Sequence, residues 1–275
     1  MKQKELLLFA ALALSVTACR TGKTTLPRQE AAPYADVQQK GKLYASFFQQ
    51  RAAEYEALSQ QAFNIARIRL DEAIAHKGDK PLAIVSDIDE TFLDNSYYAV
   101  DCVKKGISYD QKSWEEWTAK GIATPLTGAQ EFYQYADSKG VAVFYITNRL
   151  TAERAGTLAN LKKYNFPLQN EGRLILRSAE SSKENRRLQV SKDFDIVLLL
   201  GDNLSDFSKD FDKKSMAERA AAVHANKELF GTRFIVLPNF GYGDWEGAAF
   251  NYNYSLPEIQ KDSIIWKLSK RSPEE

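Results

Sequence analysis

Cysteine and histidine are scarce in this chain, which has two of each among its 275 residues. Cys19 lies near the start, so Cys102 is the single cysteine in the remainder, and we expect no internal disulfide there. Two histidines and two cysteines also leave no obvious zinc site. The folded part must therefore be stabilised by its hydrophobic core rather than by cross-links.

An excess of charge of one sign is also lacking, because 37 Lys and Arg residues balance 36 Asp and Glu residues. Electrostatic binding of nucleic acid usually needs a basic surplus, so we expect no nucleic-acid polymer as a partner. The sequence has no internal repeat and no low-complexity tract. Its 44% hydrophobic and 27% charged residues are typical of a globular protein, with one large domain or one domain and a smaller cap.

A long apolar run is missing too, because the apolar stretch at 6–16 is too short to span a bilayer as a lasting helix. It follows Lys2 and Lys4 and ends in Val-Thr-Ala-Cys at 16–19, which resembles a lipoprotein cleavage site. This order predicts a lipoprotein signal peptide over 1–18 and lipidation of Cys19, whose acyl chains would anchor the protein to a membrane. An ordinary secretory signal with a chance cysteine is the alternative.

The rest of the chain alternates between apolar runs and helical patterns. Residues 19–35, rich in Thr, Pro, Gln and Ala, predict a flexible tether, and 36–79 predict N-terminal helices of a cap region. Residues 80–275 predict an α/β core with a parallel sheet covered on both faces, interrupted by a cap excursion at about 95–126. The expected strands are 82–87, 141–147, 173–177, 195–201 and 232–237, and the expected helices are 128–139, 151–164, 182–191, 212–229 and 257–270.

Polar residues follow four of the expected strands. In chain order they are Asp87 and Asp89, then Thr147, Asn148 and Arg149, then Lys183, then Asp202 and Asp206. Because ligands bind at the carboxyl ends of parallel strands, we expect these side chains to meet at one sheet edge. Clustered carboxylates repel one another unless a cation compensates, and Mg²⁺ prefers carboxylate, water and phosphate oxygens. The pattern therefore predicts a site for Mg²⁺ and phosphate.

Such a site suits phosphoryl transfer. Asp87 is a competent nucleophile for phosphorus and would form an aspartyl-phosphate. Asp89, two residues further, can protonate a leaving alkoxide and then take a proton from water. Lys183, Thr147 and Asn148 can bind the phosphate oxygens. Each motif alone has an ordinary explanation, such as a solvated turn or a surface lysine, but their order at successive strand ends favours a site.

Five segments, in this order, resemble the haloacid dehalogenase (HAD) superfamily of phosphatases: SDIDETFLDNS, FYITNR, SSKENRR, LLLGDNLSDF and LPNFGYGDWEGA. They are most similar to class C acid phosphatases, which are bacterial outer-membrane lipoproteins acting on nucleotides and other phosphate monoesters. The resemblance covers most of 80–250 and implies a Rossmann-like HAD core with a smaller, mainly helical cap. It implies a Mg²⁺-dependent acid phosphatase or 5′-nucleotidase, anchored to the outer membrane. The oligomeric state is left open, a dimer included.

The resemblance also implies residue roles. Asp87 would be the nucleophile and Asp89 the acid and base. Mg²⁺ would be bound by the Asp87 carboxylate, the Asp89 backbone carbonyl and Asp202, with Asp206 supporting the site from nearby.

Trp114 and Tyr242 match the positions where two aromatic side chains sandwich a nucleotide base in this family. For Trp114, a place in the core of the cap is the alternative. A dehalogenase is disfavoured because it lacks a second aspartate in the position of Asp89. Histidine and cysteine phosphatases are disfavoured because neither histidine follows an arginine and Ser108 stands six residues after Cys102. A surface-exposed ligand-binding lipoprotein on a HAD scaffold, without turnover, remains the non-enzyme alternative.

Overall fold

The structure, a computed structural model, describes residues 32–274, and its compact unit begins at Tyr34. The predicted signal peptide, Cys19 and most of the predicted tether lie outside the described residues. Within the part that is described, none of the helices combines the length and apolar character needed to cross a bilayer.

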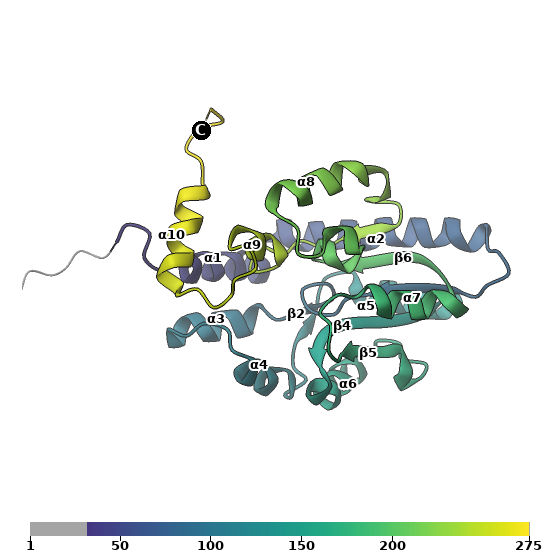
Figure 1. Ribbon diagram of the computed structural model, residues 1–275. Helices are drawn as coiled ribbons and strands as arrows, with labels where there is room; N and C mark the ends of the chain where they lie inside the picture. Colours follow the sequence, from purple (N-terminus) through teal and green to yellow (C-terminus); the bar gives the residue numbers. More distant parts are fainter. Residues whose placement is uncertain (1–31, 275) are drawn as a thin grey trace, which may run out of the picture. The chain divides into compact units, whose positions relative to one another are not determined.

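From residue 124 to residue 236, strands and α-helices alternate along the chain (Figure 1). The strands are β1 (Leu82–Ser86), β2 (Leu93–Asp94), β3 (Thr124–Pro125), β4 (Ala142–Leu150), β5 (Leu174–Arg177), β6 (Asp195–Gly201) and β7 (Phe234–Val236). The helices are α1 (Val37–Arg51), α2 (Ala53–Ala75), α3 (Ser96–Lys105), α4 (Gln111–Thr118), α5 (Ala129–Ser138), α6 (Arg154–Lys163), α7 (Glu184–Asp193), α8 (Met216–Ala225), α9 (Asp244–Ala249) and α10 (Glu258–Leu268).

The main sheet has five parallel strands in the order β5-β4-β1-β6-β7. From the central strand β1 the chain moves outward through β4 to β5, then returns to β6 on the other side and ends at β7. This is the doubly wound arrangement of an open α/β sheet, in which the strand order reverses beside β1. The predicted α/β class and parallel sheet are confirmed.

Both faces of the sheet are buried, because successive side chains of a strand point to opposite faces. Leu82 and Ile84 of β1 belong to one hydrophobic cluster, and Ala83 and Val85 belong to a second. The first cluster includes side chains of α2, α5 and α6, and the second includes side chains of α7 and α8. A strand covered on both faces must be apolar throughout, which explains the continuous apolar run at 82–85.

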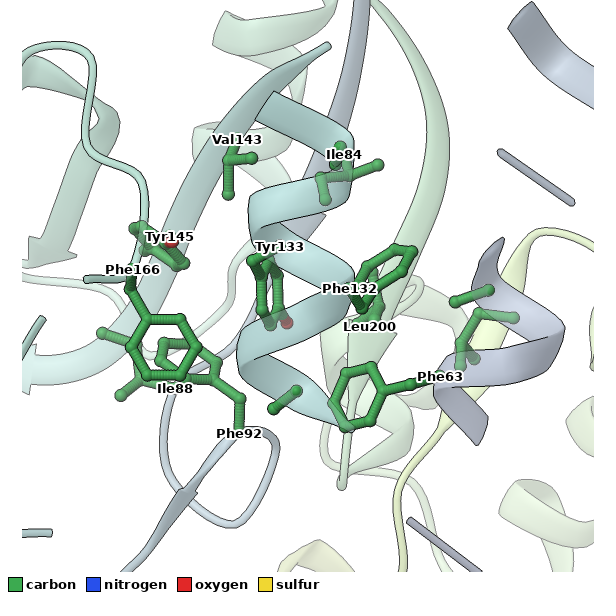
Figure 2. Close-up of a cluster of buried hydrophobic side chains, with 14 of the residues drawn as sticks. Phe63, Ile84, Ile88, Phe92, Phe132, Tyr133, Val143, Tyr145, Phe166 and Leu200 are labelled. Carbon is green, nitrogen blue, oxygen red and sulfur yellow. The ribbon is translucent and has the colours of Figure 1, made fainter. Parts of the chain in front are cut away.

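Aromatic rings fill the first cluster around α5 (Figure 2). The ring centroids of Phe92 and Phe166 lie 4.6 Å apart, and those of Phe92 and Tyr133 lie 5.0 Å apart. Tyr133 is fully buried, and its hydroxyl lies 2.5 Å from the Ser86 hydroxyl. Ser86 in turn donates to the backbone carbonyl of Asp87 at 2.6 Å. The core therefore contacts the first residue after β1 through a buried pair of hydroxyl groups.

The helical pattern at 36–76 forms two helices rather than one. The break is at Ala52, whose backbone is extended (φ −88°, ψ 123°). Contacts join α1 to α3 of the excursion and to α10, whereas α2 packs against α5, β6 and β7 (Figure 1). The excursion contains α3, α4 and β3, and β3 pairs antiparallel with β2, which immediately precedes the excursion.

Close packing of α4 against α6 requires glycine at position 156. A Cβ added to Gly156 would lie 2.2 Å from the Thr118 carbonyl oxygen and 2.6 Å from the Ala119 Cα. We expect Gly156→Ala to lower the free energy of unfolding by about 1–3 kcal/mol, because the two backbones must separate. Urea denaturation measures this difference.

Gly41→Ala on α1 is the matched control, since an added Cβ there meets no atom within 4 Å. We expect this change to raise the free energy of unfolding by about 0.5–1 kcal/mol, because alanine is the better helix former. Similar effects of the two alanine variants would contradict the close contact at position 156.

Candidate active site

The predicted site residues gather at the carboxyl ends of β1, β4 and β6. Asp87 directly follows β1, Asp202 directly follows β6, and Thr147 lies near the end of β4. Lys183 immediately precedes α7. The strand order reverses beside β1, and this is the position where open α/β sheets bind ligands.

Three carboxylates converge there. Asp87, Asp202 and Asp206 each offer an oxygen within 4.8 Å of the other two. The Lys183 ammonium contacts the Asp87 carboxylate and lies 2.7 Å from Asp206 Oδ1. The Lys183 side chain is only 6% exposed, so both ion pairs are shielded from water. One buried cation therefore compensates two of the three acids, and the cluster keeps an excess of negative charge.

Burial makes this excess charge unfavourable. It raises the pKa of Asp87 to about 7, against the opposing effect of Lys183 and with the help of Asp206. Burial also raises the pKa of Asp202 well above its usual range, and the charges of Asp206 and Asp87 add to the effect. Both carboxyls would lose their protons more readily beside a cation. Clustered carboxylate oxygens are the donors that a hard divalent ion such as Mg²⁺ prefers, so the residues present fit such an ion.

Thr91 and Asn239 orient the acids, and the sequence pattern gave them no role. Thr91 Oγ1 lies 3.1 Å from Asp202 Oδ1 and 3.4 Å from Asp87 Oδ2. Asn239 Nδ2 donates to Asp202 Oδ2 at 2.7 Å. Thr91 occupies the fifth position of Asp-x-Asp-x-Thr, and this position in the motif could have indicated that Thr91 belongs to the site.

Gly201 makes room for Asp206. A Cβ at Gly201 would lie 2.4 Å from both the Cβ and the Oδ2 of Asp206. Asp206 Oδ2 also accepts a hydrogen bond from the Asn203 backbone at 2.9 Å, which fixes the turn after β6. The glycine in Gly-Asp-Asn is therefore needed for the approach of the third carboxylate.

Asp89 forms an ion pair with Arg149 that the sequence did not predict. Arg149 Nη2 lies 2.6 Å from Asp89 Oδ1, and the Arg149 guanidinium is almost completely buried. The strand β4 continues to Leu150, beyond the predicted end at 147, because Leu150 pairs with Arg177 of β5. The register of β4 and β5 therefore extends the strand through Arg149.

The predicted phosphate-binding residues differ in their surroundings. Thr147 is fully buried, and its Oγ1 accepts a hydrogen bond from the Arg149 backbone at 3.1 Å. Asn148 is exposed, and its Oδ1 accepts from Arg186 Nη2 at 2.7 Å. Arg186 Nη1 also donates to the Thr147 carbonyl at 2.6 Å, so this side chain links the end of β4 to the segment that carries Lys183.

The hydroxyl group of Tyr242 is bonded to the segment that follows β1. Its hydroxyl donates to the Glu90 carboxylate, while 40% of the residue remains exposed. Glu90 is buried in a left-handed backbone conformation (φ +55°), and burial raises its pKa to about 8. The polar end of Tyr242 is thus fixed, and part of the residue stays accessible.

Trp114 lies on α4 within a group of aromatic residues. Its ring centroid is 5.1 Å from that of Tyr98 and 5.9 Å from the Arg149 guanidinium carbon. It is half-buried rather than fully enclosed. Trp114 therefore lies near Arg149, which pairs with Asp89. Tyr242 contacts Glu90, which follows Asp89 in the sequence.

Comparisons with known proteins agree with this geometry. The family model for HAD superfamily, subfamily IIIB (acid phosphatase) matches residues 4–245. A class C acid phosphatase from Bacillus anthracis, solved with tungstate bound, is 41% identical with a TM-score of 0.83 over 86% of this chain and 99% of its own. A second structure of the class C acid phosphatase from that organism gives the same values.

Two curated plant proteins match shorter stretches. Acid phosphatase 1 of Solanum lycopersicum is 30% identical over 131 residues, which are 44% of this chain and 50% of that protein. The stem 31 kDa glycoprotein of Glycine max is 27% identical over 168 residues, 59% of this chain and 63% of that protein. The chain thus spans between half and two thirds of the length of these relatives.

Proposed function

Because the chain belongs to the HAD superfamily, subfamily IIIB of acid phosphatases, we propose that it hydrolyses phosphate monoesters through an aspartyl-phosphate on Asp87. The observation that carries this proposal is the position of the Asp87 carboxylate at the end of β1, paired with a buried Lys183 and next to two further acids. The tungstate in the Bacillus anthracis enzyme supports it, because tungstate is a tetrahedral oxyanion like phosphate.

Asp87, Asp202 and the backbone carbonyl of Asp89 would hold Mg²⁺, which would neutralise charge on the substrate phosphate. A carboxylate oxygen of Asp87 attacks phosphorus, and the bond to the leaving oxygen breaks as Asp89 donates a proton to it. Asp89 then takes a proton from water as the water oxygen attacks phosphorus. The bond to Asp87 breaks, inorganic phosphate is released, and Asp87 is a carboxylate again. Lys183, Thr147 and Asn148 bind the remaining phosphate oxygens.

Nucleoside monophosphates are the proposed substrates, because Trp114 lies near Arg149, the partner of Asp89, and Tyr242 bonds to Glu90, the next residue. Stacking accepts every base, so we expect broad tolerance among nucleotides. A panel of nucleoside 5′- and 3′-phosphates, nicotinamide mononucleotide, sugar phosphates and 4-nitrophenyl phosphate tests this, with and without EDTA. Loss of the nucleotide preference in Trp114→Ala and Tyr242→Ala would support stacking. Binding without any turnover would instead favour the ligand-binding lipoprotein.

Magnesium should stabilise the protein against heat, since it would offset the repulsion among the three clustered acids. At about 100 times the dissociation constant the gain is about 2.7 kcal/mol, or roughly 5–10 °C in melting temperature. A thermal melt with Mg²⁺ or EDTA measures the shift. We expect Asp202→Asn to remove most of it and the exposed Asp210→Asn to leave it unchanged. An equal shift in both variants would contradict the proposed ligands.

Attachment to the outer membrane through Cys19 is a proposal that rests on residues 2–19 alone. Labelled palmitate should be incorporated into the unaltered chain in a bacterial host and not into Cys19→Ala. Equal labelling of the two chains would contradict lipidation at this residue.

A further inference from the structure

We propose that Arg149, Asn95 and Trp117 are positioning residues for Asp89, and that they leave Oδ2 as the oxygen through which Asp89 exchanges its proton. The inference rests on the proposed function, in which Asp89 is the acid and base. It concerns three residues to which the sequence assigned no role in the reaction.

Arg149 orients Asp89 and is itself held by a hydrogen bond to α6. Its Nη2 lies 2.6 Å from Asp89 Oδ1, and its Nε is 3.1 Å from both carboxylate oxygens. The other end of the guanidinium donates from Nη1 to Thr157 Oγ1 on α6 at 2.9 Å. Because the guanidinium is planar and bonded at both ends, it restricts the positions that the Asp89 carboxylate can take.

Asn95 is the second donor, and Trp117 determines which way its amide faces. Asn95 Nδ2 donates to Asp89 Oδ1 at 2.9 Å, and Trp117 Nε1 donates to Asn95 Oδ1 at 2.8 Å. An indole N–H can only donate, so the oxygen of the amide must face Trp117. The NH₂ group of Asn95 must then face Asp89. Trp117 on α4 thereby determines which group of the Asn95 amide faces Asp89.

The donors are distributed unequally between the two carboxylate oxygens. Oδ1 accepts from Arg149 Nη2, Arg149 Nε and Asn95 Nδ2, whereas among residues 32–274 Oδ2 accepts only from the shared Arg149 Nε. A proton on Oδ1 would displace at least one of three N–H donors, whereas a proton on Oδ2 leaves the two strongest in place. Oδ2 therefore gives its proton to the leaving oxygen and receives one from the attacking water, while Oδ1 stays bonded throughout.

The test is the dependence of kcat/KM on the leaving group, because a misplaced acid matters most when the leaving alkoxide is basic. Substituted phenyl phosphates, from 4-nitrophenyl to 4-methoxyphenyl, change this basicity at nearly constant size. Trp117→Phe keeps an aromatic ring but removes the indole N–H together with the second fused ring, so the same replacement at another tryptophan is needed as a control. We expect kcat/KM of Trp117→Phe and Asn95→Ala to fall on the order of tenfold for the basic leaving groups and less than about twofold for 4-nitrophenyl phosphate.

Trp266→Phe is the matched control, since Trp266 lies on α10 and is half-exposed. It should follow the unaltered protein across the series, and a thermal melt should show that all three variants fold. If kcat/KM of a folded Trp117→Phe fell equally for every leaving group, or did not fall, this inference would be overturned. The proposed function would still stand. Failure of the unaltered protein to hydrolyse any member of the series would overturn the proposed function as well.

Discussion

Asp87→Asn should reduce kcat/KM for phosphate monoesters by on the order of 10⁴-fold or more, the range seen when a covalent nucleophile is removed. Asparagine keeps the size of the side chain but cannot supply the carboxylate that attacks phosphorus. The same variant should be at least as stable as the unaltered protein in EDTA. The reason is that burial raises the pKa of Asp87 to about 7, so its charge is unfavourable in the folded protein.

Steady-state kinetics with 4-nitrophenyl phosphate and a thermal melt measure the two effects. Asp210→Asn is the control, because it makes the same chemical change at an exposed position shortly after β6. Substantial turnover by Asp87→Asn, above that expected from trace unaltered protein, would refute the nucleophile assignment. A loss of activity accompanied by unfolding would not support it either, and circular dichroism distinguishes these cases.

Lys183→Met should impair both activity and stability. Lys183 lies between Asp87 and Asp206, and its removal leaves these two buried carboxylates without their cation. Breaking a buried pair in this way costs about 3–5 kcal/mol, so we expect a marked fall in melting temperature in EDTA. The loss of a charged donor to the phosphate should lower kcat by about 10²–10³-fold.

Added Mg²⁺ distinguishes the two effects of this substitution. It should recover part of the stability of Lys183→Met, because it supplies positive charge to the same carboxylates, but it cannot replace the donor to the phosphate. Lys192→Met on α7 is the control, since Lys192 is exposed at the far end of the same helix. A Lys183→Met protein with unchanged kcat would contradict a role in phosphate binding.

The parallel sheet and the acidic cluster could be predicted because both follow from short-range patterns. Apolar runs separated by helices indicate parallel strands, and parallel strands place their following residues at one edge. Asp87, Asp202 and Asp206 could be grouped in this way without any knowledge of side-chain contacts.

The partners of Asp89 could not be predicted, because they depend on contacts between segments far apart in the sequence. Arg149 reaches Asp89 across 60 positions, after a strand that continues beyond its apolar part. Trp117 reaches Asn95 through the packing of the excursion, for which the sequence pattern was weakest. The short helix α9 was also missed, because six residues around a Gly-Asp-Trp turn carry no clear periodicity.

The buried hydroxyl pair of Tyr133 and Ser86 has a consequence for thermal inactivation. The backbone carbonyl of Asp87 is bonded to Ser86, which is bonded to a tyrosine at the centre of the aromatic cluster in Figure 2. We therefore expect the segment after β1 to unfold together with the hydrophobic interior rather than separately. Thermal inactivation and collapse of the interior should coincide in one transition, and resistance to heat would be gained by improving the interior rather than by stiffening the surface.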